Sequence, residues 1–200
     1  MIAVRSFQPA SLALLIVLLA GCSSTKLVNL WTDPQYTGPP FKKILVIGMS
    51  ERPGERRLFE EEFVRRLDMR HGVDAIPSIG LIDERSELDT ERITEAIKGT
   101  GIDAVLVTRL VSEEKRKRDQ PARTGSFDDY YFRASRTIRS KDYITEHTIV
   151  KLETNVYTAE TMTLVWSGAT ETFNPPKSIG RTMDELAKIV VDSLAENEML

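Results

Sequence analysis

Residue types that serve as nucleophile, general base or metal ligand are scarce in this chain of 200 residues. It contains one cysteine, Cys22, and two histidines, His71 and His147. A nucleophile needs a base within hydrogen-bond reach, but no G-x-S-x-G motif is present and no His/Cys cluster has zinc-like spacing. The sequence therefore predicts a protein that is not an enzyme, with no catalytic residue, no metal site and no cofactor.

The single cysteine follows a segment with the layout of a secretory signal peptide. Arg5 precedes an apolar or small run from Ala10 to Ala20, which is too short for a transmembrane helix. The tetrad Leu19-Ala20-Gly21-Cys22 resembles a bacterial lipobox, in which the cysteine is lipidated and becomes the first residue of the mature chain. The resemblance predicts a signal peptide over residues 1–21 and a lipid, palmitate included, on Cys22, where more than one acyl chain gives stable anchoring.

The residue after the cysteine bears on location. Ser23, rather than Asp, follows Cys22, and in the Gram-negative lipoproteins that this segment resembles such a residue implies sorting to the outer membrane. We therefore expect a lipid-anchored protein on the periplasmic face of the outer membrane. Residues 22–29 are predicted to be a short tether, and residues 30–200 a single domain.

Composition places the predicted mature chain among globular domains. Removal of residues 1–21 would leave 179 residues, a normal length for one domain with a proper core. The whole chain is 41% apolar and 28% charged, which is typical of a folded protein. The mature chain would carry 26 basic and 30 acidic residues, hence −4, yet residues 115–142 hold nine basic and four acidic ones. This asymmetry is a hint about partners rather than about fold.

Hydrophobic periodicity predicts the elements of the first half. The continuous apolar run at 43–48 is typical of a strand covered on both faces. The following helix carries Phe59, Phe63 and Leu67 on one stripe, and His71-Gly72 is predicted to close it. The connection from Gly48 to Gly54 lacks the Gly-Lys-Ser/Thr ending of a phosphate loop, so a plain strand-to-helix link is expected.

The later elements follow from the same rules. A short strand at 73–76 precedes a helix capped by Asp89, and a third apolar strand begins at Asp103. Alternation from Ile144 to Val156 and again from Met162 to Trp166 predicts antiparallel strands. The last helix has Thr182 and Glu185 at capping-box spacing. The expected fold is an α+β two-layer sandwich, with a mixed sheet of about five strands in the order β-α-β-α-β-β-β-α.

A set of short motifs spread over the predicted domain resembles a family of small proteobacterial outer-membrane lipoproteins of unknown function. Besides the lipobox, the motifs are Trp31-Thr32-Asp33-Pro34-Gln35-Tyr36, Lys43-Ile44-Leu45-Val46-Ile47, Asp103-Ala104-Val105-Leu106-Val107-Thr108, Glu153-Thr154-Asn155-Val156-Tyr157 and Leu164-Val165-Trp166-Ser167-Gly168. The order of strands and helices is also similar to the compact domain of LpoB, CsgG and the TolB amino-terminal region. The resemblance implies a fold and an envelope location, and it carries over no functional residue.

The segment 115–142 is the unusual part of the sequence. It is predicted to be a long loop that combines a basic run with aromatic residues, and long loops within compact domains are often functional. Arg116, Arg118, Tyr130 and Tyr131 are the candidate partner-binding residues, since Arg and Tyr commonly anchor interfaces. A solvated hairpin extension and a contact with anionic lipid or glycan are the alternatives. Nucleic acid is not expected as a partner at an envelope location.

These observations predict a non-catalytic accessory or scaffold protein of the envelope. The membrane is one partner, through the lipid on Cys22, and an envelope protein of unknown identity is the other. Two alternatives stay open. The chain is a subunit of a homo-oligomeric assembly that pairs through a sheet edge, or it is an envelope hydrolase whose site includes His147.

Overall fold

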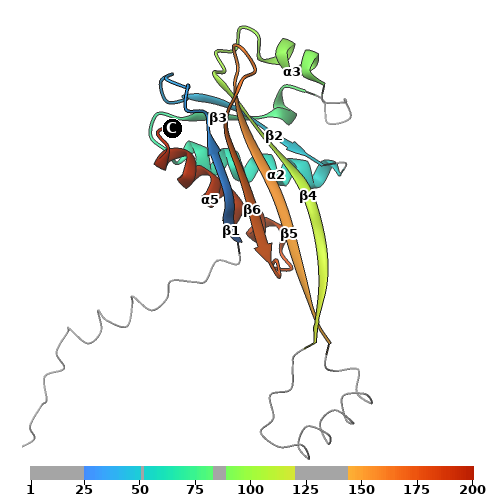
Figure 1. Cartoon of the computed structure of the whole chain (residues 1–200). Helices are drawn as coiled ribbons and strands as arrows, with labels where there is room; N and C mark the ends of the chain where they lie inside the picture. The colour runs from blue at the N-terminus through green and yellow to red at the C-terminus, as the bar shows by residue number, and fades with distance from the viewer. Residues whose placement is uncertain (1–24, 51, 83–88, 120–143) are drawn as a thin grey trace, which may run out of the picture.

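A computed structural model describes residues 25–50, 52–82, 89–119 and 144–200. Three α-helices, one short 3-10 helix and six strands are found in these ranges (Figure 1). The elements in chain order are β1 (Thr25–Thr32), β2 (Lys43–Met49), α2 (Pro53–Asp68), β3 (Asp74–Pro77), η2 (Ser78–Gly80), α3 (Thr90–Ile97), β4 (Ala104–Asp119), β5 (Ile144–Thr158), β6 (Leu164–Phe173) and α5 (Ile179–Glu196).

The six strands form one mixed sheet in the order β1-β6-β5-β4-β2-β3. β2 pairs in parallel with both β3 and β4, as expected for strands joined through intervening helices. β4, β5, β6 and β1 are antiparallel neighbours, which agrees with the alternation of apolar and polar residues in β5 and β6. The predicted α+β architecture is thus confirmed, with six strands in place of about five.

The additional strand is β1, which lies at one edge of the sheet. It begins at Thr25, so most of the predicted tether, residues 22–29, belongs to a strand. Its pairing with β6 shifts at a bulge between Leu27 and Asn29, and four consecutive residues from Val28 to Trp31 are exposed. Because a bulged edge strand buries no regular face, it leaves little alternation in the sequence.

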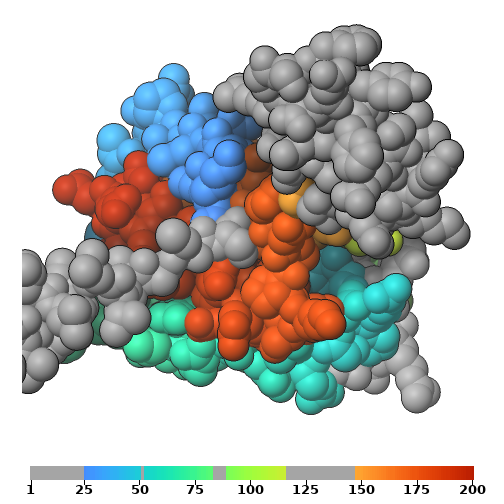
Figure 2. Space-filling view, turned by 90° about the horizontal axis from the view of Figure 1, so that it is seen from below, coloured from blue at the N-terminus to red at the C-terminus, as the bar shows by residue number. Residues whose placement is uncertain are grey.

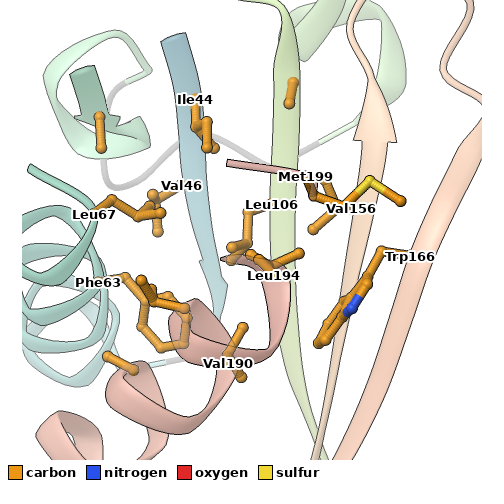
Figure 3. Close-up of a cluster of buried hydrophobic side chains, with 14 of the residues drawn as sticks. Ile44, Val46, Phe63, Leu67, Leu106, Val156, Trp166, Val190, Leu194 and Met199 are labelled. Atoms are coloured by element: carbon orange, nitrogen blue, oxygen red, sulfur yellow. The ribbon is translucent and has the colours of Figure 1, made fainter. Parts of the chain in front are cut away.

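Helices α2 and α5 cover one face of the sheet and enclose the larger core (Figure 3). Phe63 and Leu67 of α2 lie there with Val190 and Leu194 of α5, and all four are almost fully buried. From the strands, Ile44, Val46, Leu106, Val156 and Trp166 point into the same layer. The stripe that predicted the first helix is therefore its core-facing side.

Within the described residues, the helix that packs on the opposite face is α3, near the top of the view in Figure 1, and it contacts β2 and β4. A second, smaller core there joins Leu45 and Ile47 to Ile97, Ile102 and Val105. Alternate residues of β2 are thus buried on opposite faces, which confirms the interpretation of its continuous apolar run.

Two predicted helix ends are wrong and one is confirmed. The predicted capping box of Thr182 and Glu185 is wrong, because α5 begins one turn before Thr182 and that residue is buried inside the helix. Glu185 instead accepts a hydrogen bond from the Thr25 hydroxyl at 3.2 Å. α2 ends at Asp68, so His71 lies in the turn beyond it; Gly72 has a φ of 85° in that turn. Asp89 caps α3 as expected, accepting from the Arg92 amide at 2.7 Å.

The two core helices are also joined by an ion-pair cluster at their surface. Asp184 of α5 accepts from Arg66 Nε at 2.9 Å and also from Arg65. Burial alone would raise the pKa of Asp184, but the hydrogen bonds from Arg66 and Arg65 outweigh it, so the pKa lies below its usual value of 3.8. The cluster therefore adds stability above the unfolded pKa and loses it as the pH falls through the lower folded value.

Replacement of Asp184 with asparagine is expected to lower the free energy of unfolding by less than about 1 kcal/mol at pH 7, because the cluster is partly exposed to solvent. At a pH of about 2 or below the difference from the parent protein should shrink, since the carboxyl is then largely protonated in both states. Urea denaturation at the two pH values checks this. A difference that grows on acidification would contradict the assignment.

Candidate functional site

Part of the sheet has no helix over it within the described residues, namely the face opposite α2 and α5 on β1, β6 and the adjoining stretches of β5 and β4. The pairing places rows of residues across this surface, which we call the helix-free face. One row is Trp31, Ser167 and Asn155; a second is Asn29, Ala169, Glu153 and Arg109; a third is Lys26, Glu171 and Lys151; a fourth is Phe173 and Ile149. The alternate residues point toward α2 and α5 and are largely buried.

Cross-strand ion pairs run over the helix-free face. Glu171 lies between Lys151 at 3.1 Å and Lys26 at 3.6 Å, and Arg109 pairs with Glu153 at 2.6 Å. The hydrogen bond from Lys151 is the main reason that the pKa of Glu171 is lowered. These carboxylates are neutralised by cations at the surface, so they have the character of a solvated, charged face rather than of an acid–base pair.

His147 lies at the lower end of this face on β5. Its ring packs on Phe173 with a centroid distance of 4.8 Å, and its Nδ1 is 3.1 Å from the side-chain nitrogen of Asn174. Neither contact supplies a nucleophile or orients the ring toward one. In the described ranges no three His, Cys, Asp or Glu side chains are grouped so as to hold a metal ion. The hydrolase alternative thus gains no support from the surroundings of His147.

The connection after β2, considered above as a phosphate loop, is filled by a side chain of the protein itself. Glu60 of α2 is fully buried, and its Oε1 accepts from the Gly48 amide at 3.1 Å, from Arg56 Nε at 3.0 Å and from the Ser78 hydroxyl at 2.5 Å. Its Oε2 accepts from the Ile79 amide at 3.0 Å. Since a carboxylate already takes the Gly48 amide that would face a phosphate, the connection is the plain strand-to-helix link expected from the sequence, and the buried network beside it is structural.

The predicted loop at 115–142 begins later than expected. Residues up to Asp119 continue β4, and β5 starts at Ile144, so the two strands form a long hairpin. β6 pairs with β5 only as far as Ile149 opposite Phe173. Beyond that row the hairpin is a two-stranded projection, which we call the arm, and it consists of residues 115–119 and 144–148 (Figure 1). A two-stranded ribbon continues here because cross-strand hydrogen bonds need no third strand.

The structure places only two of the predicted site residues. Arg116 pairs with His147 and Arg118 with Thr145 in the arm. Tyr130 and Tyr131 lie outside the described residues, and so does Cys22. Of the segment 115–142 predicted as one contact surface, only residues 115–119 belong to a described element, the end of β4.

The edge of β1 was missed by sequence reasoning. Val28, Leu30 and Trp31 are exposed by 38, 47 and 46%, so one eight-residue strand carries three of the large exposed apolar side chains. The available signal was the group of apolar residues at the junction of the predicted tether, which contains Val28, and the predicted domain, which begins with Leu30 and Trp31. Exposed apolar residues gathered on one edge strand are typical of an interaction surface.

No helix in the described part of the chain is both long and apolar enough to span a bilayer.

Comparison with known proteins gave no matching family model and no matching curated protein. Among solved structures, the chain is similar to the PelC dodecamer from Paraburkholderia phytofirmans, with 10% identity over 83% of this chain and 94% of that one and a TM-score of 0.47. It is similar also to the lipoprotein GNA1162 from Neisseria meningitidis, with 15% identity over 78% of this chain and 99% of that one and a TM-score of 0.40. A hypothetical protein from Chlamydia trachomatis, CT253, is similar at 9% identity over 80% and 94% of the two chains, with a TM-score of 0.37. The structural neighbours of this chain thus include a lipoprotein and PelC, at identities that leave its function to be argued from its own residues.

Proposed function

We propose that this protein is a lipid-anchored, non-catalytic binding module on the periplasmic face of the bacterial outer membrane. The lipid on Cys22 holds it at the membrane, and a protein partner binds the β1 edge. The observation that carries the proposal is the exposure of Val28, Leu30 and Trp31 on that edge strand. The resemblance of Leu19-Ala20-Gly21-Cys22 to a lipobox supports the anchor.

The kind of partner follows from the chemistry of the edge. No strand pairs with the outer side of β1 in the part of the chain that the structure describes, so its outward-facing backbone groups are available there. An extended apolar segment of another chain can add to such an edge, with main-chain hydrogen bonds for affinity and apolar side chains beside Trp31 and Leu30 for specificity. The alternative partner is a second copy of this protein, which could form main-chain hydrogen bonds with the same edge of β1.

Photo-crosslinking in living cells tests the proposal. A crosslinker at Trp31 is expected to give a discrete adduct with another envelope protein, whereas one at Glu61, on the exposed side of α2, should give none. An adduct of the protein with itself at Trp31 would favour the homo-oligomer instead. Absence of a protein adduct at Trp31 would contradict a partner at this edge.

The anchor is tested separately. Metabolic labelling with a palmitate analogue is expected to mark the wild-type chain and not a Cys22→Ser variant. Unlabelled wild-type protein would contradict lipidation, whatever the crosslinking shows.

A further inference from the structure

The sheet has two edge strands, β1 and β3, and β1 is open on its outer side. Just past β1, the Asp33 amide donates to the Val165 carbonyl of β6 at 2.9 Å. Because backbone groups along an antiparallel strand alternate between its two sides, those of Trp31 also point to β6, whereas those of Leu30 and Thr32 point outward. Neither outward amide donates a hydrogen bond to any residue that the structure describes. Figure 2 shows β1, in blue, at the molecular surface beside α5, in red.

The outer side of β3 is closed. Asp74 donates its amide hydrogen to the Lys42 carbonyl at 2.7 Å, so its backbone groups point to β2. Those of Ala75 and Pro77 therefore point outward, by the same alternation. The Ala75 amide donates to Asp68 Oδ1 at 2.9 Å, and a proline has no amide hydrogen. The edge of β3 thus offers no free donor to an incoming strand.

The position of Asp68 supports a role at this edge. It is the last residue of α2, where the helix dipole is negative and a carboxylate is unfavourable. Arg65 and Arg66 place the favourable charge in the same last turn. The hydrogen bond from Ala75 gives the carboxylate a specific partner in this unfavourable position. A capped amide and a proline are therefore the two features that keep β3 from pairing further.

We infer that the protein partner binds by adding one strand to β1, through the outward backbone groups of Leu30 and Thr32, and that β3 takes no strand. This inference rests on the proposed binding edge. It adds the mode of binding, which is main-chain pairing, and the valence, which is one added strand for each copy of the protein. Because β3 is closed, copies of the protein do not join β1 to β3 in an open-ended row.

The occupant is an extended segment of another chain. A stable contact between two rigid domains takes about 20–30 residues on each side. The bulge between Leu27 and Asn29 leaves a regular edge of only residues 29–32. A segment that belongs to no sheet of its own can follow the bulge and pack beside Trp31 and Leu30, which are about half exposed.

A proline substitution separates strand addition from side-chain packing. Thr32→Pro removes an outward amide hydrogen, and β1 keeps its hydrogen bonds to β6 because that amide points away from β6. Thr32→Ala is the matched control, since it loses the same hydroxyl and keeps the amide. With the crosslinker at Trp31 in living cells, we expect the parent level of adduct in Thr32→Ala and a decrease of about tenfold or more in Thr32→Pro. Leu30→Pro against Leu30→Ala repeats the comparison at the other outward amide.

The outcomes distinguish this inference from the proposed function. An undiminished adduct in both proline variants would overturn strand addition and leave the binding edge in place. Absence of an adduct in the parent would overturn the binding edge itself. Far-ultraviolet circular dichroism checks that each variant is folded. A crosslinker at Asp74, which is exposed on β3, should give no adduct, and an adduct there would overturn the single valence.

Hydrogen exchange tests both edges in the full chain with Cys22→Ser, which carries no lipid. The Leu30 and Thr32 amides are expected to exchange at least about a hundredfold faster than the Trp31 amide between them. The Ala75 amide should exchange slowly in spite of its place on an edge, and Asp68→Ala should speed it by about tenfold or more. Slow exchange at both outward amides of β1 would overturn the open edge, and unchanged exchange of Ala75 would overturn the closure of β3.

Discussion

Replacement of Glu60 with alanine is expected to lower the free energy of unfolding by about 3–5 kcal/mol. The side chains of Arg56 and Glu60 are 4% and 0% exposed, and they form a buried ion pair. Removal of one partner leaves the other charge buried and unpaired, which is the costly way to break such a pair. The Gly48 and Ile79 amides and the Ser78 hydroxyl lose their acceptor as well.

A matched control lies two residues further along the same helix. Glu62 pairs with Arg65 at the surface, so Glu62→Ala should cost less than about 1 kcal/mol. Urea denaturation of the two variants and the parent measures both effects. If Glu60→Ala cost no more than Glu62→Ala, the buried network would not hold α2, β2 and η2 together as we describe.

The second large effect is expected at Trp166. This indole is fully buried in the larger core, so Trp166→Ala should lower the free energy of unfolding by about 3–5 kcal/mol through lost burial and an unfilled cavity. Its ring packs directly over Gly168, where an added Cβ would come within 2.3 Å of the ring carbon Cη2. Gly168→Ala should therefore cost about 1–3 kcal/mol, because the ring must move.

The two effects are coupled, and a double-mutant cycle reveals the coupling. In the Trp166→Ala background the methyl group of Gly168→Ala meets no ring, so its cost should fall to a fraction of that in the parent. Ser167→Ala, on the helix-free face between them, should stay within about 0.5 kcal/mol in both backgrounds. An equal cost of Gly168→Ala with and without the indole would show that the ring is not what makes glycine necessary there.

The strands and helices with strong periodicity were predictable from sequence. β2 is a run of apolar residues because it is buried on both faces. β5 and β6 alternate because, among the residues that the structure describes, no helix lies over one of their faces. β1 was not predictable in the same way. Its bulge and its place at the edge remove the alternation, and only the pairing with β6 defines it as a strand.

The buried network shows the same limit at the level of side chains. Arg56 and Glu60 are four residues apart on a helix, a spacing that usually indicates a solvated surface pair. Their burial arises because η2 and the end of β2 pack over that side of α2. No local pattern in the sequence contains the position of Ser78, eighteen residues after Glu60.

The sequence by itself determined the class of fold, the candidate lipidation site at Cys22 and the concentration of basic residues after Lys115, since these depend on residue type and short-range spacing. The tertiary structure alone decided that the start of β1 and the arm lie at one end of the sheet, and that Arg116 pairs with His147 and Arg118 with Thr145. The physical reason is strand register. The pairing of Thr25 with Thr172, 147 residues away in the sequence, joins β1 to the β6–β5–β4 pairings and so brings Thr25 and Glu113 into one row.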